Sequence, residues 1–304
     1  MIPLRLRNPA FGYGFVLLCL ALPVARAATP SPAQAPPWSV NLTPAIVVAG
    51  SPELIRVEAP ASSQLSGEWL GRKLEFFRSR SGHAWFALAG IDVEAAPGAS
   101  TLRIEAKLAG GGSRDLSRAV EIHPAHYRTA ALSVAPKFVQ PPTEALKEIE
   151  DESQLKARVF AASAPEPEWI GDFHAPVAAE PTDSFGTRRM LNGKLATIHK
   201  GMDFRARMGT VVRAGNSGTV VLARPLYYEG NCVIIDHGLG LFTLSMHFSR
   251  IDVKVGQHVA QGQPLGLSGA TGRVTGPHLH WAVRWQGAYL DPAKLLKLNL
   301  AQAR

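Results

Sequence analysis

Short segments of strand character, separated by turns, run through most of the chain and restrict what it can fold into. The 304 residues include 28 glycines and 23 prolines. These residues punctuate runs rich in β-branched and aromatic side chains, a pattern typical of strands bounded by turns. We therefore expect a mostly β protein, and its length favours two folded domains over one.

The first 27 residues have the pattern of a secretory signal peptide. Arg5 and Arg7 precede an apolar run, and Ala-Arg-Ala at 25–27 offers a cleavage site after Ala27. The apolar run at 15–24 is too short to span a membrane. We therefore predict an exported protein.

A lipid anchor is not expected. Cys19 lies in the apolar run, but Leu18 stands where a lipoprotein signal would need a small residue.

Cleavage of the signal peptide would remove three arginines and no acid, which lowers the formal net charge from +8 to +5. This balance helps association with anionic surfaces without selecting among them, and no basic stripe with interleaved aromatics indicates nucleic acid.

One cysteine, Cys232, remains in the mature chain. It lies in an apolar run, which predicts a buried hydrophobic residue rather than a catalytic thiol. A single cysteine allows no internal disulfide.

The positions of glycine and proline, together with changes in composition, divide the rest of the chain into segments. Residues 28–37 read as a Pro/Ala linker. Residues 38–125 contain about seven short strands with regular turns, which predicts an immunoglobulin-like β-sandwich. No acids or histidines cluster there, so a spacer or binding module is the simplest interpretation.

A connector, residues 126–170, follows the predicted sandwich. Pro141 and Pro142 precede Thr143, a candidate helix cap, and residues 144–160 read as a charged helix. Its thin apolar stripe indicates that it lies over a neighbouring surface rather than inside a core.

The segment 171–296 is dense in glycine and in strand-like runs, which predicts an antiparallel β domain, with 297–304 as a C-terminal tail.

Three stretches of the predicted antiparallel domain hold four of the ten histidines: IHKGMD at 198–203, SMHFS at 245–249 and GPHLH at 276–280. His199 and Asp203 are four residues apart, so an extended segment would turn both to one face. His280 from a neighbouring strand would complete a set of two nitrogens and one carboxylate. That set suits a catalytic zinc whose fourth position is left to water.

Two further histidines, His247 and His278, are candidates for taking a proton from that water and stabilising an oxyanion. No H-E-x-x-H helix is present to supply a glutamate base. His278 and His280 would lie on one strand face, about 7 Å apart.

Each of these motifs alone also fits a structural role. An H-x-x-x-D pair occurs in ordinary loops, and two histidines on a strand face are often solvated. His247 fits a semi-buried polar residue, and His237, in the turn DHGLG, competes for any of the roles. Only the order and context of the three stretches favour a site.

The stretches IHKGMDF, SMHFS and GATGRVTGPHLHW, set among VIIDHG and VKVGQHVAQGQPLG, resemble the lysostaphin- and LytM-type zinc metallopeptidases. The resemblance covers roughly residues 185–292. It implies a compact antiparallel β-barrel-like domain with a groove, one zinc ion, and cleavage of peptide bonds in bacterial peptidoglycan.

The resemblance also implies a role for each residue. By position, His199, Asp203 and His280 are the expected zinc ligands, and His247 and His278 are the expected catalytic histidines.

The chain departs from the family near the lone histidine. Ser245 stands where the family often has tyrosine, and Phe248 where it often has leucine. We expect at most an effect on substrate subsites. In the upstream stretch SFGTRRMLNG, Arg188 and Arg189 are candidates for contact with a substrate carboxylate.

The function implied is that of an exported zinc metalloendopeptidase that cuts peptidoglycan cross-links by attack of a zinc-bound water, with a D,D-endopeptidase expected. The plain signal peptide and the lack of repeated wall-anchoring modules favour a Gram-negative periplasm, with secretion or cell-wall association as alternatives. The bond would then join D-alanine to diaminopimelate.

Two other classes of function remain open. One is a non-catalytic LytM-type regulator that binds or activates another cell-wall hydrolase, although such a protein would be expected to have lost ligands. The other is a wall-binding module with incidental histidines and no zinc. The long connector also suggests that the N-terminal domain and the helix cover the groove until a regulatory protein partner moves them.

Overall fold

The computed structural model describes residues 1–2, 38–60, 63–79, 82, 84–193 and 195–303. The predicted linker, and the predicted signal peptide beyond its first two residues, lie outside the described residues. The chain from Pro36 to Arg304 forms one compact unit. No helix within the described ranges is long and apolar enough to cross a membrane.

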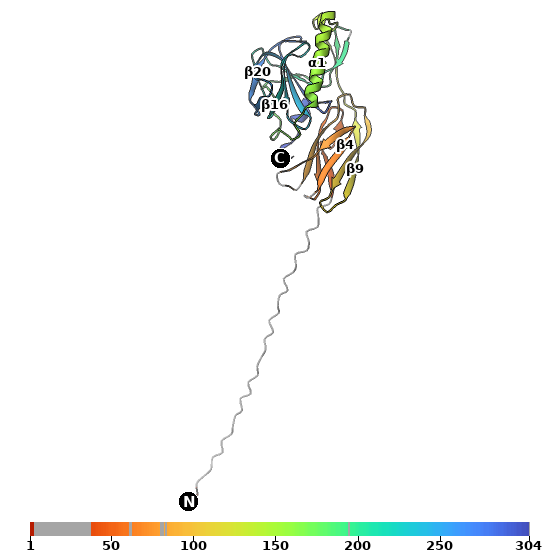
Figure 1. The fold of residues 1–304 in the computed structure, drawn as a ribbon, viewed down its shortest axis with the longest axis vertical. Helices are drawn as coiled ribbons and strands as arrows, with labels where there is room; N and C mark the ends of the chain where they lie inside the picture. The colour runs from red at the N-terminus through yellow and green to blue at the C-terminus, as the bar shows by residue number, and fades with distance from the viewer. Residues whose placement is uncertain (3–37, 61–62, 80–81, 83, 194, 304) are drawn as a thin grey trace. The chain divides into compact units, whose positions relative to one another are not determined.

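The N-terminal part of this unit is a sandwich of two sheets, coloured orange to yellow in Figure 1. One sheet has the order β1-β3-β7-β6 and the other β2-β9-β8-β4-β5. The strands are β1 Ser39–Thr43, β2 Val47–Val48, β3 Pro52–Glu58, β4 Gln64–Trp69, β5 Arg72–Glu75, β6 Phe77–Arg78, β7 Trp85–Gly90, β8 Gly98–Lys107 and β9 Ser113–His123. Leu54 on β3 and Ile104 on β8 belong to one core, as two packed sheets require. The predicted mostly β class is confirmed.

The connector holds a strand, a 3-10 helix and the expected α-helix: β10 Thr129–Leu132, η1 Pro136–Phe138 and α1 Thr143–Ala161. Thr143 is the first helical residue, and Pro142 occupies the N-cap position without a side-chain hydrogen bond. The expected threonine cap is therefore wrong, because its hydroxyl already lies inside the first turn.

Helix α1 lies over the C-terminal sheet, as its thin apolar stripe predicted. Leu155, Val159 and Phe160 pack on a buried cluster that includes Leu222 and Phe242. Figure 1 shows α1 beside β16.

The C-terminal sheet has the order β11-β14-β21-β18-β17-β16-β19, with β15, β20 and β22 attached, and all its pairings are antiparallel. Its strands are β11 Pro181–Asp183, β14 Met202–Phe204, β15 Val211–Arg213, β16 Gly218–Leu226, β17 Gly230–Asp236, β18 Leu241–Ile251, β19 His258–Val259, β20 Pro264–Ser268, β21 Leu279–Trp285 and β22 Ala288–Leu290. The predicted antiparallel arrangement is present.

A small three-stranded sheet stands beside it. β12 (Arg188–Leu191) pairs antiparallel with β13 (Leu195–Ile198) and parallel with β10 of the connector. After α2 (Pro292–Leu295), the segment expected as a tail ends in η2 (Ala301–Ala303) and buries Leu298 and Leu300 in the core.

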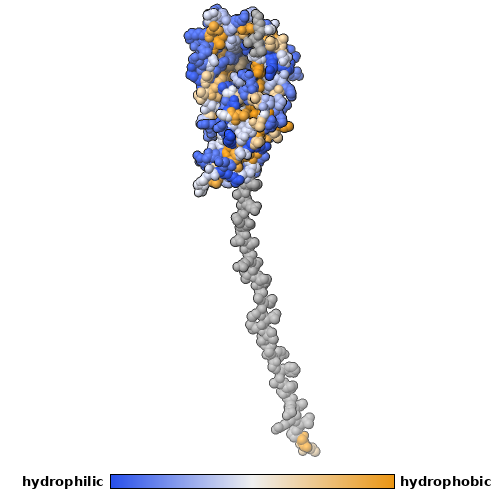
Figure 2. Space-filling model, turned by 90° about the vertical axis from the view of Figure 1, so that its right-hand side faces the viewer, coloured by the Kyte–Doolittle hydropathy of each residue, from blue (hydrophilic) through white to orange (hydrophobic). Residues whose placement is uncertain are grey.

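The surface mixes polar and apolar residues. On the face drawn in Figure 2, hydrophobic residues are scattered among hydrophilic ones, and the described residues of that face form no large continuous apolar patch. Cys232 is fully buried beneath α1, and burial raises the pKa of its thiol, as expected for a hydrophobic core residue.

Candidate metal and catalytic site

Three buried side chains from separate elements meet at one point. His199 Nε2 lies 3.1 Å from Asp203 Oδ1 and 3.0 Å from His280 Nδ1, and these last two atoms are 2.9 Å apart. Ligands held about 2.0–2.1 Å from a tetrahedral zinc are separated by roughly 3.3 Å. The three atoms therefore fit one face of such a site to within a few tenths of an ångström. Among the described residues, this is the group of His, Cys, Asp and Glu side chains placed to hold a metal.

Strand register brings Asp203 and His280 together, because they are direct partners across the β14–β21 pair. His199 arrives differently from what its spacing suggested. It follows the end of β13, and the chain bends at Gly201 before β14 begins, so no continuous extended segment joins His199 to Asp203. A Cβ at Gly201 would lie 2.4 Å from His280 Nε2, so this bend requires glycine.

Hydrogen bonds orient His199 for binding a metal. Its Nδ1–H donates to the carbonyl of Ser184 at 3.0 Å, which leaves the lone pair on Nε2. The same ring nitrogen lies 3.4 Å from Asp183 Oδ2.

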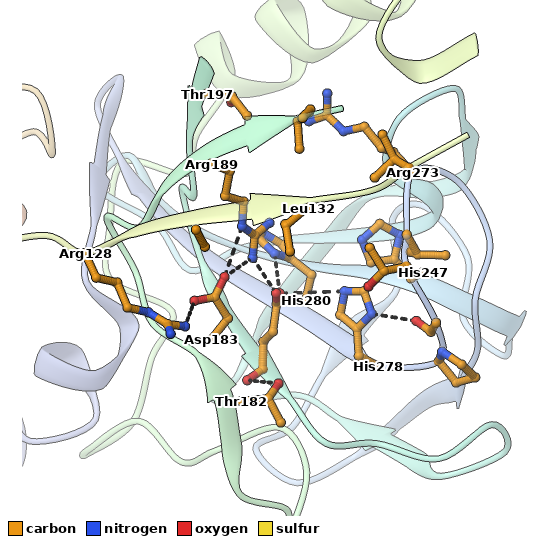
Figure 3. Close-up of a pocket in the computed structure, with 18 residues that line it drawn as sticks. Arg128, Leu132, Thr182, Asp183, Arg189, Thr197, His247, Arg273, His278 and His280 are labelled. Carbon is orange, nitrogen blue, oxygen red and sulfur yellow. Dashed lines mark hydrogen bonds and ion pairs between the residues drawn. The ribbon is translucent and has the colours of Figure 1, made fainter. Parts of the chain in front are cut away.

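Arg189 supports the carboxylate on the opposite side from the histidines. Its guanidinium donates to Asp203 Oδ2 at 2.6 Å and also pairs with Asp183, which in turn accepts from Arg128 (Figure 3). Arg189 is thus paired with two acids, and its contact with a substrate carboxylate stays a prediction. Arg188 is exposed to solvent.

The side chain of His247 enters the site from an irregular part of β18. The pairing of β18 with β17 and β20 shifts register around this residue, and its backbone φ is 67°. For a residue other than glycine this conformation costs on the order of 1–3 kcal/mol. Its Nδ1–H donates to the carbonyl of Thr271 at 2.8 Å, which leaves Nε2 available in the groove.

His278 occupies the neighbouring position, just before β21. Its Nδ1–H donates to the carbonyl of Gly276 at 2.8 Å, and its Nε2 lies 3.7 Å from Asp203 Oδ1. The ring centroids of His247 and His278 are 4.9 Å apart. Both histidines therefore have their Nδ1 engaged by a backbone carbonyl and lie beside the three-residue cluster.

The buried setting changes the protonation of the cluster. Burial would raise the pKa of Asp203, but hydrogen bonds and charges from His199 and His280 hold it well below its usual range. Burial lowers the pKa of His280 to about 4 against the opposing effect of Asp203. Burial also lowers the pKa of His247 to about 3, with further lowering from its histidine neighbours. At neutral pH an ionised carboxylate thus faces a neutral His280 ring, the form in which these groups bind metals.

Two adjoining cavities open onto the cluster. One, of about 410 Å³, is lined by His247, His278 and His280 and by connector residues around β10 (Figure 3). The other, of about 320 Å³, is lined by His199, His247 and His280 on the side of β13. The site is therefore a groove that a substrate chain can enter.

All five residues singled out by the motifs meet at this groove, whereas His237 does not. His237 is buried, donates from Nδ1 to the carbonyl of Ser217 at 2.7 Å, and lies 2.9 Å from the hydroxyl of Thr243. Burial lowers its pKa to about 4, so it is a neutral core residue. The two departures, Ser245 and Phe248, are also buried and line neither cavity.

The motifs did not indicate the supporting groups Asp183, Ser184 and Thr271. A signal was present for Thr271, since it stands in the glycine-rich stretch before the H-x-H pair. No sequence signal pointed to Asp183, because only the pairing of β11 with β14 brings it close to Asp203.

Residues 197–292 match the model of peptidase family M23. This chain carries a peptidase M23 domain. The resemblance indicated by the three stretches is confirmed, and the match includes all five of the residues that meet at the groove.

Curated relatives match over the same part of the chain. The peptidoglycan DD-endopeptidase ShyA of Vibrio cholerae is 46% identical over 110 residues, which are 36% of this chain and 25% of that protein. ShyB of the same organism, also a peptidoglycan DD-endopeptidase, is 41% identical over 115 residues, 37% of this chain and 27% of that protein. The chain thus spans about a quarter of the length of these relatives.

A solved structure matches more of the chain. The crystal structure of a putative peptidase M23 from Pseudomonas aeruginosa has a TM-score of 0.63 and 29% identity, and covers 82% of this chain and 94% of that chain. The shared fold therefore extends beyond the residues that match the family model.

Proposed function

We propose that this chain is an exported zinc metalloendopeptidase that hydrolyses peptide cross-links of bacterial peptidoglycan as a D,D-endopeptidase. The convergence of His199, Asp203 and His280 beside two further histidines carries this proposal. A metal-binding group of this kind at an open groove is what metal-assisted hydrolysis requires.

His199 Nε2, His280 Nδ1 and Asp203 Oδ1 would hold the zinc. Bound there, a zinc ion supplies a water of lowered pKa and polarises the scissile carbonyl. Arg189 and Ser184 keep the ligands oriented through Asp203 Oδ2 and His199 Nδ1.

His247 and His278 supply the proton chemistry. Each has its Nδ1–H fixed by a backbone carbonyl, so its Nε2 faces the groove. One of the two would take a proton from the attacking water, and the other would lie beside the developing oxyanion.

The bond and the location rest on the relatives and on the first 27 residues. ShyA and ShyB are peptidoglycan DD-endopeptidases, which supports cleavage between D-alanine and diaminopimelate. The signal pattern supports export, with a Gram-negative periplasm as the proposed compartment.

A non-catalytic LytM-type regulator would have the same fold without catalysing hydrolysis. All five residues are present, and their side chains converge, which favours the enzyme. A wall-binding module with incidental histidines would have no reason to align three ligand atoms.

The roles of His280 and His278 are asymmetric and can be tested together. We expect His280→Ala to lose both zinc and activity, and His278→Ala to lose at least 100-fold in peptidoglycan hydrolysis while keeping most of its zinc. Zinc content by plasma mass spectrometry and dye release from labelled sacculi measure the two effects.

A chelator should abolish hydrolysis, and added zinc should restore it. Full activity after chelation, or in His247→Ala, would refute the zinc mechanism.

A further inference from the structure

Arg273 lines both cavities of the groove and differs from the other cations there. The other arginine and lysine side chains that line the cavities are all in ion pairs: Arg128 with Asp183, Arg189 with Asp183 and Asp203, and Lys200 with Glu94. Within the part of the chain that the structure describes, no carboxylate lies within ion-pair distance of the Arg273 guanidinium. A permanent charge is thus presented to the groove outside any ion pair, since the nearby Glu229, which attracts it at longer range, is paired with Lys156.

The loop that carries Arg273 is held firmly. Its backbone N–H donates to the carbonyl of Tyr228 at 2.8 Å, and its guanidinium lies 4.8 Å from the Tyr228 ring centroid. Gly272 packs directly on the backbone of Gly230, where a Cβ would lie 2.3 Å from the amide nitrogen. These contacts hold the loop backbone and place the guanidinium against the Tyr228 ring.

The same loop places Arg273 next to the reacting groups. Thr271, two residues earlier, accepts the hydrogen bond that orients His247. Figure 3 shows the Arg273 side chain extending from this loop toward Thr197, on the opposite wall. Thr197 and Arg273 both line both cavities. A substrate lying in the groove would pass the guanidinium.

The setting of Arg273 favours an anionic partner. Burial lowers the pKa of this guanidinium, although it stays charged at any physiological pH. A partly desolvated cation gains most from a bidentate carboxylate, which restores hydrogen bonds and neutralises the charge.

The substrate class of the proposed function carries such a group. Diaminopimelate has an amine and a carboxylate on the same carbon, so an amide formed by that amine keeps a free carboxylate next to the scissile nitrogen. Other carboxylates occur further along the peptide stem.

We propose that Arg273 is a specificity residue that binds a carboxylate of the peptide stem while the cross-link is cleaved. This inference rests on the proposed function. It adds a substrate contact made by none of the metal-binding or proton-transferring side chains.

The test compares Arg273→Gln and Arg273→Lys with the wild type on synthetic cross-linked peptides. One peptide has all its carboxylates free, one is amidated next to the scissile bond, and one is amidated at a more distant carboxylate. We expect Arg273→Gln to lose roughly 10- to 100-fold in kcat/KM on the free peptide, the range for a charge-assisted hydrogen bond. On the peptide in which the carboxylate bound by Arg273 is amidated, wild type and Arg273→Gln should have nearly equal kcat/KM.

Controls separate this outcome from loss of folding or of net charge. Arg224→Gln removes the same charge at an exposed position on β16 and should behave as wild type. Arg273→Lys keeps the charge and should retain part of the preference. Zinc content and thermal melting show whether each variant is folded.

The amidated peptide that equalises wild type and Arg273→Gln identifies which carboxylate is bound. If Arg273→Gln loses the same factor on all three peptides, or loses nothing, the carboxylate contact is wrong. If wild type cleaves no cross-linked peptide, the proposed function has failed instead.

Discussion

At the scale of single residues, Asp203 is held between two histidines on one side and Arg189 on the other. Taken in their order along the chain, the H-x-x-x-D pair, the lone histidine and the H-x-H pair predict the metal-binding and catalytic side chains. The supporting contacts were out of reach, because Asp183, Arg189 and Asp203 become neighbours only through strand pairing. Arg189 is an example. Its charge was evident from the sequence, but its ion pairs with Asp183 and Asp203 were not.

Glu53 on β3 predicts how stability depends on pH. Its carboxylate is fully buried and has no well-formed hydrogen bond within the described residues, and nearby Ser51 and Lys294 only partly offset the burial. Burial raises the pKa of Glu53 to about 8, from 4.5. Between these values the folded state keeps a proton that the unfolded state has lost. Stability should therefore fall as pH rises through this window, by up to about 1.4 kcal/mol per pH unit.

Glu53→Gln keeps the shape of the side chain and removes its ionisation. We expect similar melting temperatures for wild type and variant at pH 5, and a more stable variant above pH 8. Glu121→Gln, at an exposed position on β9, is the control and should not change the pH profile. Parallel profiles for Glu53→Gln and wild type from pH 5 to 9 would show that Glu53 does not carry the linkage.

At the scale of elements, strands and the connector helix followed from local patterns, and their partners did not. The charged run 144–160 predicted α1 closely. The parallel pairing of β10 with β12 is absent from any local pattern, because pairing between segments so distant in sequence leaves no periodic signature. The bend at Gly201 was not predicted for a related reason. The even spacing between His199 and Asp203 fits one continuous strand, and it fits equally well two strand ends joined by a bend.

Helix α1 supports the turn at 227–230, and this support should matter for activity. Glu152 of α1 accepts hydrogen bonds from the Tyr227 backbone N–H at 2.9 and 3.1 Å, and Lys156 pairs with Glu229. On the other side of the turn, the carbonyl of Glu229 accepts from the backbone N–H of His247 at 3.0 Å. The helix is therefore linked through one turn of chain to His247, which we propose to be catalytic.

We expect Glu152→Ala to lower kcat several-fold at temperatures where the protein remains folded, with zinc content unchanged. The loss of the bifurcated hydrogen bond from the Tyr227 N–H to this buried carboxylate should also cost about 1–3 kcal/mol of stability. Glu150→Ala, exposed on the same helix, should leave both unchanged. A folded Glu152→Ala variant with the kcat of wild type would mean that the helix does not position His247.

At the scale of the whole molecule, the connector is part of the groove as well as a link. β10 contributes Ala130 and Leu132 to the wall of the larger cavity, and α1 covers an apolar cluster of the C-terminal sheet. A chain reduced to residues 171–304 would lose both. We therefore expect it to hydrolyse peptidoglycan more slowly than residues 28–304, with the loss in kcat and not in zinc content.

The hypothesis that the N-terminal domain and α1 cover the groove expects the opposite result. Dye release from labelled sacculi at equal protein concentration compares the two chains directly. A folded, zinc-loaded 171–304 fragment that is faster than the longer chain would support covering and contradict a supporting role for the connector.

The groove around His199, Asp203 and His280 is proposed to cleave the cross-link between D-alanine and diaminopimelate. The most direct test is mass analysis of a purified tetrapeptide–tetrapeptide dimer after digestion by the zinc-loaded protein in oxygen-18 water. We expect two tetrapeptide monomers whose masses sum to the dimer plus one water, with the label in the new D-alanine carboxylate. Label in any other group, an uncleaved dimer, or equal products from His247→Ala would contradict this proposal.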